Sequence, residues 1–403
     1  KSDFKMFRLL QGDVGSGKTI ISFIAAANVI RSNWQVALMA PTEILAKQHY
    51  NLATKIFKST GISIKFLSGK SNFKEKKAIQ ENLANGKINF IIGTHALFQK
   101  NILFKKLGLI IIDEQHKFGV KQRINLSNKG GKNCDILLMS ATPIPRSLIL
   151  AFYGDMDVSK LIEKPMFRKN TITLSKPEEK IDEIIIFIKN QIKNGNQIFW
   201  VCPLIEESKK LAYSAAVKKY NQLSNKFPNK IGLIHGSLNI DERNKVLNDF
   251  LKKTIDILIS TTVIEVGIDF PNANVIVIEN SNKFGLSQLH QLRGRVGRGT
   301  SQSTCILLYK NNLSEKAKKR IKILKSSNDG FFIAEEDMKL RGFGDVLGFQ
   351  QSGIKEFKLA DPIQHEDLFK IAEQNIKEIE HDENNFNRYN FLLKLFDKAD
   401  IIN

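Results

Sequence analysis

Short apolar, β-branched runs alternate with stretches of helical period in two successive series along the chain. Apolar strands that alternate with helices are typical of parallel sheets covered by helices, so the pattern predicts an α/β fold with two such sheets. The first series predicts strands at residues 7–11, 35–40, 63–67, 88–93, 107–113 and 135–140, with helices such as 43–57 and 73–83 between several of them. The second predicts strands at residues 171–175, 197–201, 230–234, 256–260, 274–279 and 304–309, with helices such as 180–193 and 241–251.

The stretch between the two series has no clear period. It contains Gly154 and Pro165, which favour a connection, so we place a domain junction within residues 153–169. After about Lys325 the pattern changes to glycine-rich loops and then to acidic helices that reach Ala399. We therefore expect three units, in the order of the sequence. They are two α/β domains at residues 1–160 and 161–325 and a small α-helical C-terminal unit at residues 326–403.

The turn after the first predicted strand carries a phosphate-loop pattern. Residues 12–19 read Gly-Asp-Val-Gly-Ser-Gly-Lys-Thr and fit G-x-x-x-x-G-K-[ST] in full. Glycines let backbone N–H groups approach phosphate oxygens, and the N-terminus of the following helix adds its dipole. Lys18 would reach the β- and γ-phosphates of a nucleotide, and Thr19 would ligate Mg²⁺. Because a strand and a helix flank the motif, a phosphate loop is favoured over an ordinary glycine-rich turn.

Two adjacent carboxylates end another predicted strand. The apolar run at residues 107–112 is followed directly by Asp113 and Glu114. Asp113 would hold Mg²⁺ through water, and Glu114 would polarise an attacking water molecule. An apolar strand that ends in Asp-Glu is common and mostly structural when it stands alone. In a chain that also has a phosphate loop, it predicts the second half of an NTPase site.

A third segment concentrates arginine in a chain that mostly uses lysine. Residues 291–298 read Gln-Leu-Arg-Gly-Arg-Val-Gly-Arg, although 49 of the 61 basic residues are lysine. A planar guanidinium binds phosphate in a way that a lysine ammonium cannot reproduce. An arginine that a second domain delivers to the γ-phosphate is an arginine finger. The segment therefore predicts such a finger, and a generic basic loop is the alternative.

The charge of the chain suggests a partner without defining it. The net charge is +20, and residues 326–403 hold nine basic and sixteen acidic residues, so the preceding residues carry +27. A basic body suggests a polyanion such as nucleic acid, while a lysine-biased composition explains the charge equally well. Apolar and charged fractions of 42% and 25% exclude wholesale disorder and collagen-like or disulfide-scaffold classes. Apolar runs stay far below the ~18 residues of a membrane span.

The cysteines and the start of the chain add two expectations. Cys134, Cys202 and Cys305 are widely separated and show neither metal-ligand nor disulfide spacing, which indicates a reducing compartment. The first residues show no signal-peptide pattern, and the chain opens at Lys1, without methionine, immediately before a predicted strand. We expect it to be a fragment of a longer protein.

Further motifs occur in the order known for superfamily 2 helicases and translocases, and the chain resembles that superfamily over nearly its whole length. The matching segments are Ala-Pro-Thr-Glu at 40–43, Gly-Thr-His-Ala-Leu at 93–97, Ser-Ala-Thr-Pro at 140–143, His-Gly-Ser-Leu at 235–238 and Ser-Thr-Thr-Val-Ile-Glu-Val-Gly-Ile-Asp at 260–269. The resemblance implies two tandem RecA-like P-loop NTPase domains with parallel sheets, which face each other across a nucleotide cleft.

Within the superfamily the chain resembles the RecG family of bacterial branch-migration helicases. The segments that carry this resemblance are Asp-Glu-Gln-His-Lys-Phe-Gly-Val at 113–120, Val-Cys-Pro-Leu-Ile-Glu-Glu-Ser at 201–208, Met-Lys-Leu-Arg-Gly-Phe-Gly-Asp at 338–345, Gln-Ser-Gly at 351–353 and Glu-Phe-Lys-Leu-Ala-Asp at 356–361. The third and fourth resemble a translocation hairpin and loop that this family shares with transcription-repair coupling factors. Phe343, Asp345 and Gln350 stand where the family usually has Pro, Glu and Arg. The family's N-terminal wedge domain would precede Lys1.

The resemblance implies an ATP hydrolase that moves on branched DNA, at stalled forks and Holliday junctions, in recombination and repair. Its partners would be DNA, contacted mainly at phosphates, and single-strand DNA-binding protein, with no membrane, in the bacterial cytoplasm. A transcription-repair coupling factor type translocase is the alternative, and a non-hydrolysing nucleic-acid scaffold is an alternative of another class.

Site residues follow from the motifs and the resemblance. The residues expected to bind ATP are Gly12, Asp13, Val14, Gly15, Ser16, Gly17, Lys18, Thr19, Gly267 and Asp269. Those expected to bind Mg²⁺ are Thr19 and Asp113. The residues expected to act in catalysis are Lys18, Asp113, Glu114, Gln291, Arg295 and Arg298. Those expected to couple hydrolysis to movement or to contact DNA are Thr42, Thr94, His116, Ser140, Thr142, Thr262, Arg341 and Gln351.

Overall fold

The computed structural model describes most of the chain up to Arg341. The described residues are 5–69, 72–99, 101–114, 134–141, 156–163, 169–203, 209–236, 238–261, 270–297, 299, 301–341 and seven residues between 365 and 375. Two parallel sheets lie in one compact unit, which comprises Lys1–Pro143 and Asp157–Leu340. A second unit comprises Ile144–Met156 and Arg341–Asn403, and few of its residues are described.

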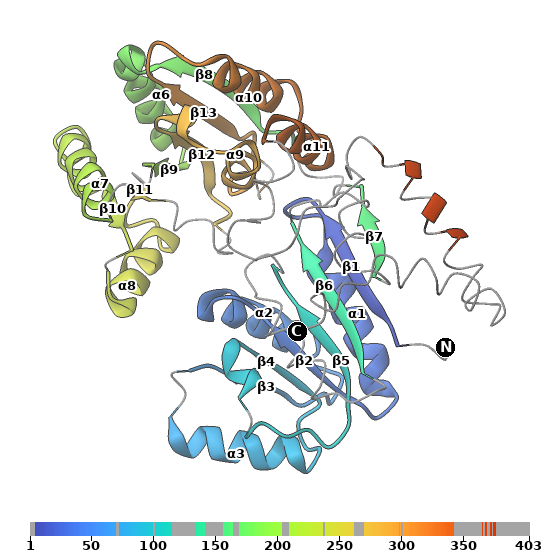
Figure 1. The fold of residues 1–403 in the computed structure, drawn as a ribbon. Helices are drawn as coiled ribbons and strands as arrows, with labels where there is room; N and C mark the ends of the chain where they lie inside the picture. Colours follow the sequence, from blue (N-terminus) through green and yellow to red (C-terminus); the bar gives the residue numbers. More distant parts are fainter. Residues whose placement is uncertain are drawn as a thin grey trace. The chain divides into compact units, whose positions relative to one another are not determined.

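The first sheet has seven parallel strands within the described residues. They are β1 (Phe7–Gly12), β2 (Gln35–Met39), β3 (Ile64–Leu67), β4 (Phe90–Gly93), β5 (Leu107–Ile112), β6 (Asp135–Ser140) and β7 (Asp157–Leu161). Their order across the sheet is β3-β4-β2-β5-β6-β1-β7 (Figure 1). The accompanying helices are α1 (Lys18–Arg31), α2 (Glu43–Ile56), α3 (Phe73–Ala84) and the short η1 (His95–Phe98). The six strands predicted for this series are confirmed, with ends that shift by at most two residues.

An aromatic cluster fixes the helices on this sheet. Phe23 of α1 and Phe90 of β4 meet edge to face, with ring centroids 5.9 Å apart, and Phe57 packs against both. Burying a phenylalanine contributes roughly 1.5–3 kcal/mol, and an edge-to-face pair adds to that. The strands β2 and β5 are buried along their whole length. This burial on both faces explains why they read as continuous apolar runs.

The seventh strand corrects one expectation. Residues 153–169 are predicted as an aperiodic junction, yet β7 lies within them and pairs in parallel with β1. Asp157 forms a salt bridge of 2.9 Å with Arg8, and the Arg8 Nη1 donates to Ser159 Oγ at 2.8 Å. The strand occupies the sheet edge, and its side chains are half-buried or exposed. Polar edge strands lack the apolar run that marks a buried strand, so the pattern could not reveal it.

The second sheet has six parallel strands in the part of the chain that the structure describes. They are β8 (Ile172–Pro177), β9 (Gln197–Val201), β10 (Ile231–Ile234), β11 (Ile257–Ser260), β12 (Ala273–Ile278) and β13 (Thr304–Tyr309), in the order β10-β11-β9-β12-β13-β8. The helices of this part are α6 (Ile181–Lys193), α7 (Lys209–Ser224), α8 (Ile240–Leu251), α9 (Leu286–Arg293), α10 (Glu315–Ser326) and α11 (Gly330–Arg341), with short η3 (Glu178–Lys180) and η5 (Ser281–Lys283). The six predicted strands are confirmed to within two residues.

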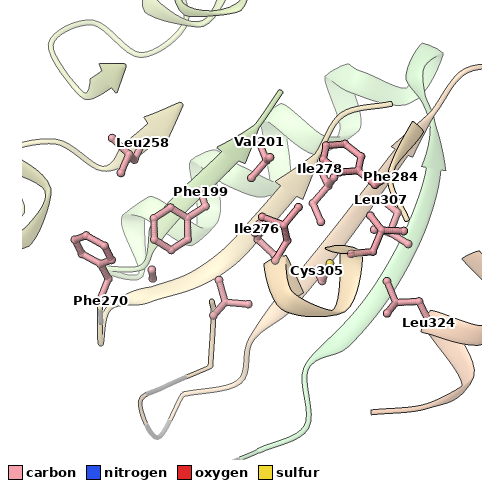
Figure 2. Close-up of a cluster of buried hydrophobic side chains, with 14 of the residues drawn as sticks. Phe199, Val201, Leu258, Phe270, Ile276, Ile278, Phe284, Cys305, Leu307 and Leu324 are labelled. Carbon is pink, nitrogen blue, oxygen red and sulfur yellow. The ribbon is translucent and has the colours of Figure 1, made fainter. Parts of the chain in front are cut away.

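One face of this sheet carries a core of large apolar side chains (Figure 2). Phe199 and Phe270 meet edge to face at 5.5 Å, while Ile276, Leu307 and Cys305 extend the cluster. Cys134, Cys202 and Cys305 are all free and buried, and burial raises the pKa of Cys134 and of Cys305 to about 12. These cysteines therefore serve as small apolar side chains.

Helix α11 corrects a second expectation, since glycine-rich loops are predicted after Lys325. Asp329 starts the helix, because its carboxylate accepts a hydrogen bond from Phe331 N at 2.8 Å. Farther along α11, the buried Asp337 accepts hydrogen bonds from Leu286 N and Ser287 N, both at 3.2 Å. The first turn of α9 is thus capped by a side chain from another helix. This contact fixes α9 against α11.

No described helix is long and apolar enough to cross a membrane.

Candidate nucleotide site

The turn between β1 and α1 has the backbone of a phosphate loop. Gly15 and Gly17 have φ values of 78° and 95°, in the left-handed region that glycine tolerates best. A Cβ on Gly12 would collide with Ser16 Oγ and lie 3.0 Å from Leu161 Cβ. Glycine is therefore required at three places in this turn.

The loop has polar groups that fit a phosphate. Lys18 Nζ donates to the carbonyl oxygens of Gly12 at 2.6 Å and Asp13 at 2.9 Å, so the ammonium lies over the loop. Ser16 Oγ is buried without a hydrogen-bond partner among the described residues. A buried hydroxyl that lacks a partner is costly unless a ligand or water satisfies it. The turn at the N-terminus of α1 therefore suits a bound phosphate.

Asp113 follows β5 directly and is held by two hydrogen bonds. His49 Nε2, from α2, lies 2.8 Å from Asp113 Oδ2, and Glu114 N donates to Asp113 Oδ1 at 3.0 Å. Burial acts to raise the pKa of Asp113, but the His49 hydrogen bond and charge, Lys18 and the Glu114 N–H together hold that pKa below its usual value. Asp113 is therefore a carboxylate at neutral pH, as a metal ligand must be.

Glu114 adopts a strained backbone, with φ of 51°. Such a conformation costs roughly 1–3 kcal/mol in a residue other than glycine and persists only where the surroundings enforce it. Glu114 lies at the edge of the sheet formed by the carboxyl ends of the strands, where ligands bind in open α/β folds.

Replacing His49 by phenylalanine is expected to destabilise the protein by about 1–3 kcal/mol at neutral pH, because buried Asp113 loses a donor. Without that donor, burial raises the folded-state pKa of Asp113. A depressed carboxyl pKa stabilises the fold above the unfolded value of about 3.9, and this contribution disappears as the pH falls through the folded pKa. The difference between wild type and variant should therefore shrink below about pH 4. Urea unfolding across pH measures it, with Asn51→Ala on the exposed face of α2 as control.

The arginine-rich segment begins in α9, on the second sheet. Gln291 and Arg293 belong to the helix, and Arg295 follows it and is 7% exposed. A Cβ on Gly294 would lie 3.2 Å from Val14 of the phosphate loop, so the two segments are in close contact. Arg298 lies outside the described residues, so its finger role stays a prediction.

Other predicted residues follow strands of the first sheet. Thr42 caps α2 after β2, with its Oγ1 accepting from Leu45 N at 3.4 Å, Thr94 follows β4, and Ser140 is buried at the end of β6. Because the strands are parallel, these residues share one sheet edge with Gly12 and Asp113. The predicted His116, Thr142, Thr262, Gly267, Asp269 and Gln351, and the side chain of Arg341, lie outside the described residues.

Three contacts of the site were not predicted from the sequence. His49 is a lone histidine whose default interpretation is structural, yet it binds Asp113. His290 binds Asp13 of the phosphate loop at 2.8 Å, across 277 residues of sequence. Arg293 belongs to the recognised arginine cluster but donates to the carbonyl oxygens of Leu324 and Ser327 and to His290. Only the arginine cluster offered a signal in the sequence. Catalysis was assigned there to Arg295 and Arg298, and nothing in the sequence predicted the contacts of Arg293.

Three family models match successive parts of the chain. Residues 5–149 match the DEAD/DEAH box helicase family, residues 177–300 the helicase conserved C-terminal domain, and residues 327–397 the C-terminal part of domain 3 of the ATP-dependent DNA helicase RecG. The last match distinguishes the RecG family from other groups of superfamily 2. The chain belongs to the RecG family.

Similar proteins agree with this assignment. The ATP-dependent DNA helicase RecG of Thermotoga maritima is 48% identical over 94% of this chain and 49% of its own length, and RecG of Bacillus subtilis is 47% identical over 93% and 55%. A structure of RecG bound to a three-way DNA junction is 45% identical, with a TM-score of 0.75, over 91% of this chain and 48% of that one. Yeast Dbp5, at 18% identity and a TM-score of 0.59, shows the shared fold alone. The chain spans about half the length of the curated relatives it matches.

Proposed function

We propose that this chain is the motor of an ATP-driven DNA translocase and helicase that acts on branched DNA. The observation that carries the proposal is the close contact between the phosphate loop and the arginine-rich segment, with Gly294 against Val14 and His290 on Asp13. In such an arrangement, Lys18 binds the β- and γ-phosphates, Glu114 orients the attacking water, and Arg295 and Arg298 stabilise the charge that develops on the transferred group.

Mg²⁺ fits this site. Magnesium is held by one or two carboxylates together with substrate phosphates and water, so a cage of several acidic residues is not required. We assign its protein ligands to Asp113, which is a carboxylate at neutral pH, and Thr19, at the start of α1. The ion supplies neutralisation of the phosphate charge.

The DNA substrate is inferred from the relatives and from the charge. The solved RecG relative is bound to a three-way DNA junction, and the net charge of +20 favours a polyanion. Contacts mainly to phosphates would make binding independent of sequence and sensitive to salt. Single-strand DNA-binding protein is a further proposed partner, and the bacterial cytoplasm the proposed location. The RecG-type match at residues 327–397 favours this function over a transcription-repair coupling factor.

Single-turnover ATP hydrolysis, measured with and without a synthetic three-way junction, tests the proposal. A motor for branched DNA should hydrolyse ATP faster when the junction is present, and more strongly than with linear duplex of the same length. A rate of ATP hydrolysis that does not change when DNA is added contradicts the DNA-motor function. Absence of hydrolysis under both conditions supports the non-hydrolysing scaffold instead.

Replacing Arg341 by alanine is expected to uncouple hydrolysis from movement. Arg341 is the last residue of α11 and precedes Gly342, in the segment that resembles the family's translocation hairpin. ATP hydrolysis and DNA binding should persist while branch migration of the junction collapses. If Arg341 only forms a local surface ion pair, its loss should cost well under ~1 kcal/mol of stability and leave branch migration unchanged. Lys339→Ala, two residues earlier in α11 and exposed, is the matched control.

A further inference from the structure

A chain of buried hydrogen bonds joins the phosphate loop to α9. His290 Nε2 lies 2.8 Å from Asp13 Oδ1, and His290 Nδ1 lies 2.9 Å from Arg293 Nη2. Asp13 is 8% exposed, His290 is 6% exposed and Arg293 is 3% exposed. Phosphate binding by a loop does not require such a connection. The connection therefore needs its own explanation.

The direction of these hydrogen bonds follows from the donors. An arginine guanidinium can only donate, so His290 Nδ1 accepts from Arg293 Nη2. The ring proton must then lie on Nε2, which donates to Asp13 Oδ1. The imidazole is thus neutral and fixed in one tautomer, between a carboxylate and a guanidinium. A side chain in this place must donate on one side and accept on the other.

Both ends of the chain are anchored. Asp13 Oδ1 also accepts from Val14 N at 2.7 Å, which fixes the start of the phosphate loop. Arg293 Nη1 donates to the carbonyl oxygens of Leu324 at 2.6 Å and Ser327 at 2.9 Å, at the end of α10. The hydrogen bonds therefore run from the loop after β1 to the end of α10.

Close packing leaves His290 and Asp13 little room for movement. A Cβ on Gly330, the first residue of α11, would lie 2.9 Å from His290 Nε2 and 3.1 Å from Asp13 Cγ. The adjoining cavity, which Asp13, His290 and Arg293 help to line, has a volume of about 30 Å³. That is enough to hold water. The three side chains themselves are buried, and between buried groups hydrogen bonds are stronger than in water and a missing partner is costly.

We propose that His290 is a positioning residue for ATP hydrolysis, which acts through Asp13 and Arg293. It holds the phosphate loop at a fixed place relative to the segment that carries Gln291, Arg295 and Arg298. The proposal rests on the proposed function, because it concerns the same nucleotide site. The loop and Lys18 hold the nucleotide in the ground state, whereas the arginines act on the transition state. Loss of His290 should therefore lower kcat much more than it raises the KM for ATP.

Two substitutions separate positioning from mere packing. His290→Phe keeps a planar ring but can neither donate nor accept. His290→Gln keeps a donor group and an acceptor atom, both bonded to the same carbon. Because a misplacement of about 1 Å can cost about 10²-fold in rate, we expect His290→Phe to lower kcat by about 10²-fold with a nearly unchanged KM. We expect His290→Gln to recover most of this loss, and Gln288→Ala, on the exposed side of α9, to match wild type.

A double substitution and a spectrum complete the test. If His290 acts through Asp13, the Asp13→Ala and His290→Phe effects on kcat should not add. The ¹⁵N spectrum of histidine-labelled protein should show His290 protonated at Nε2 and not at Nδ1, and Asp13→Ala should perturb that signal. This spectrum reports on the contact between His290 and Asp13 whether or not the wild type hydrolyses ATP. Failure of the proposed function is therefore recognised separately.

The outcomes that overturn the proposal are specific. They are wild-type kcat in His290→Phe, a loss in His290→Gln as large as in His290→Phe, additive effects in the double variant, or a His290 tautomer protonated at Nδ1. If His290→Phe fails to fold, His290→Gln and the spectrum of the wild type still decide.

Discussion

Replacing Lys18 by alanine is expected to abolish ATP hydrolysis while leaving the fold intact. Lys18 Nζ donates to backbone oxygens of the loop, and the side chain is half-buried, so it contributes little to the apolar core. Its ammonium group would stabilise charge on the phosphates during transfer. Loss of one such electrostatic contact lowers kcat by about 10²–10³-fold. DNA-stimulated hydrolysis under single-turnover conditions measures the effect.

The control for this variant is Lys55→Ala, which removes an exposed lysine from α2. It has the same change of charge and should hydrolyse ATP like wild type. Thermal unfolding of both variants should stay close to that of the wild type. Hydrolysis by Lys18→Ala at a rate similar to that of the control would show that residues 12–19 are not the phosphate loop of the active site.

Replacing Arg298 by lysine is expected to lower turnover far more than a charge-conserving change normally does. A finger arginine contributes about 10³–10⁵-fold to the rate in well-studied NTPases. An ammonium group keeps the charge but cannot form two parallel hydrogen bonds with a phosphate. Nucleotide affinity should fall much less than turnover. Measuring kcat together with the affinity for ATP separates the two effects.

Arg31→Lys is the matched control, because Arg31 is exposed at the end of α1. Near-normal turnover in Arg298→Lys would remove Arg298 as the finger. Arg295, which is buried just after α9, would then be the candidate, and Arg295→Lys should show the large loss in its place. Arg293 is a less suitable finger, since one of its terminal nitrogens serves two backbone carbonyls.

The sequence determined the strands of the two sheets and the backbone of the turn at residues 12–19 because their signals are local. A buried parallel strand must be apolar along its length, as in residues 107–112, and a phosphate loop needs glycine where the backbone turns left-handed, as at Gly15 and Gly17. Both requirements act within a few neighbouring residues. They can therefore be recognised in the linear order, and the strand predictions are confirmed to within two residues.

Only the tertiary structure decided which distant side chains meet. Strand β7 forms because Arg8 and the edge of β1 are present to pair with it, and its own residues lack an apolar run. His49 reaches Asp113 across 64 positions, and His290 reaches Asp13 across 277. A single histidine carries no periodic signal, and its role depends on the donor or acceptor that packing brings to its ring. Sequence thus determined the local backbone, whereas the burial and hydrogen bonding of isolated polar residues depended on how the elements pack.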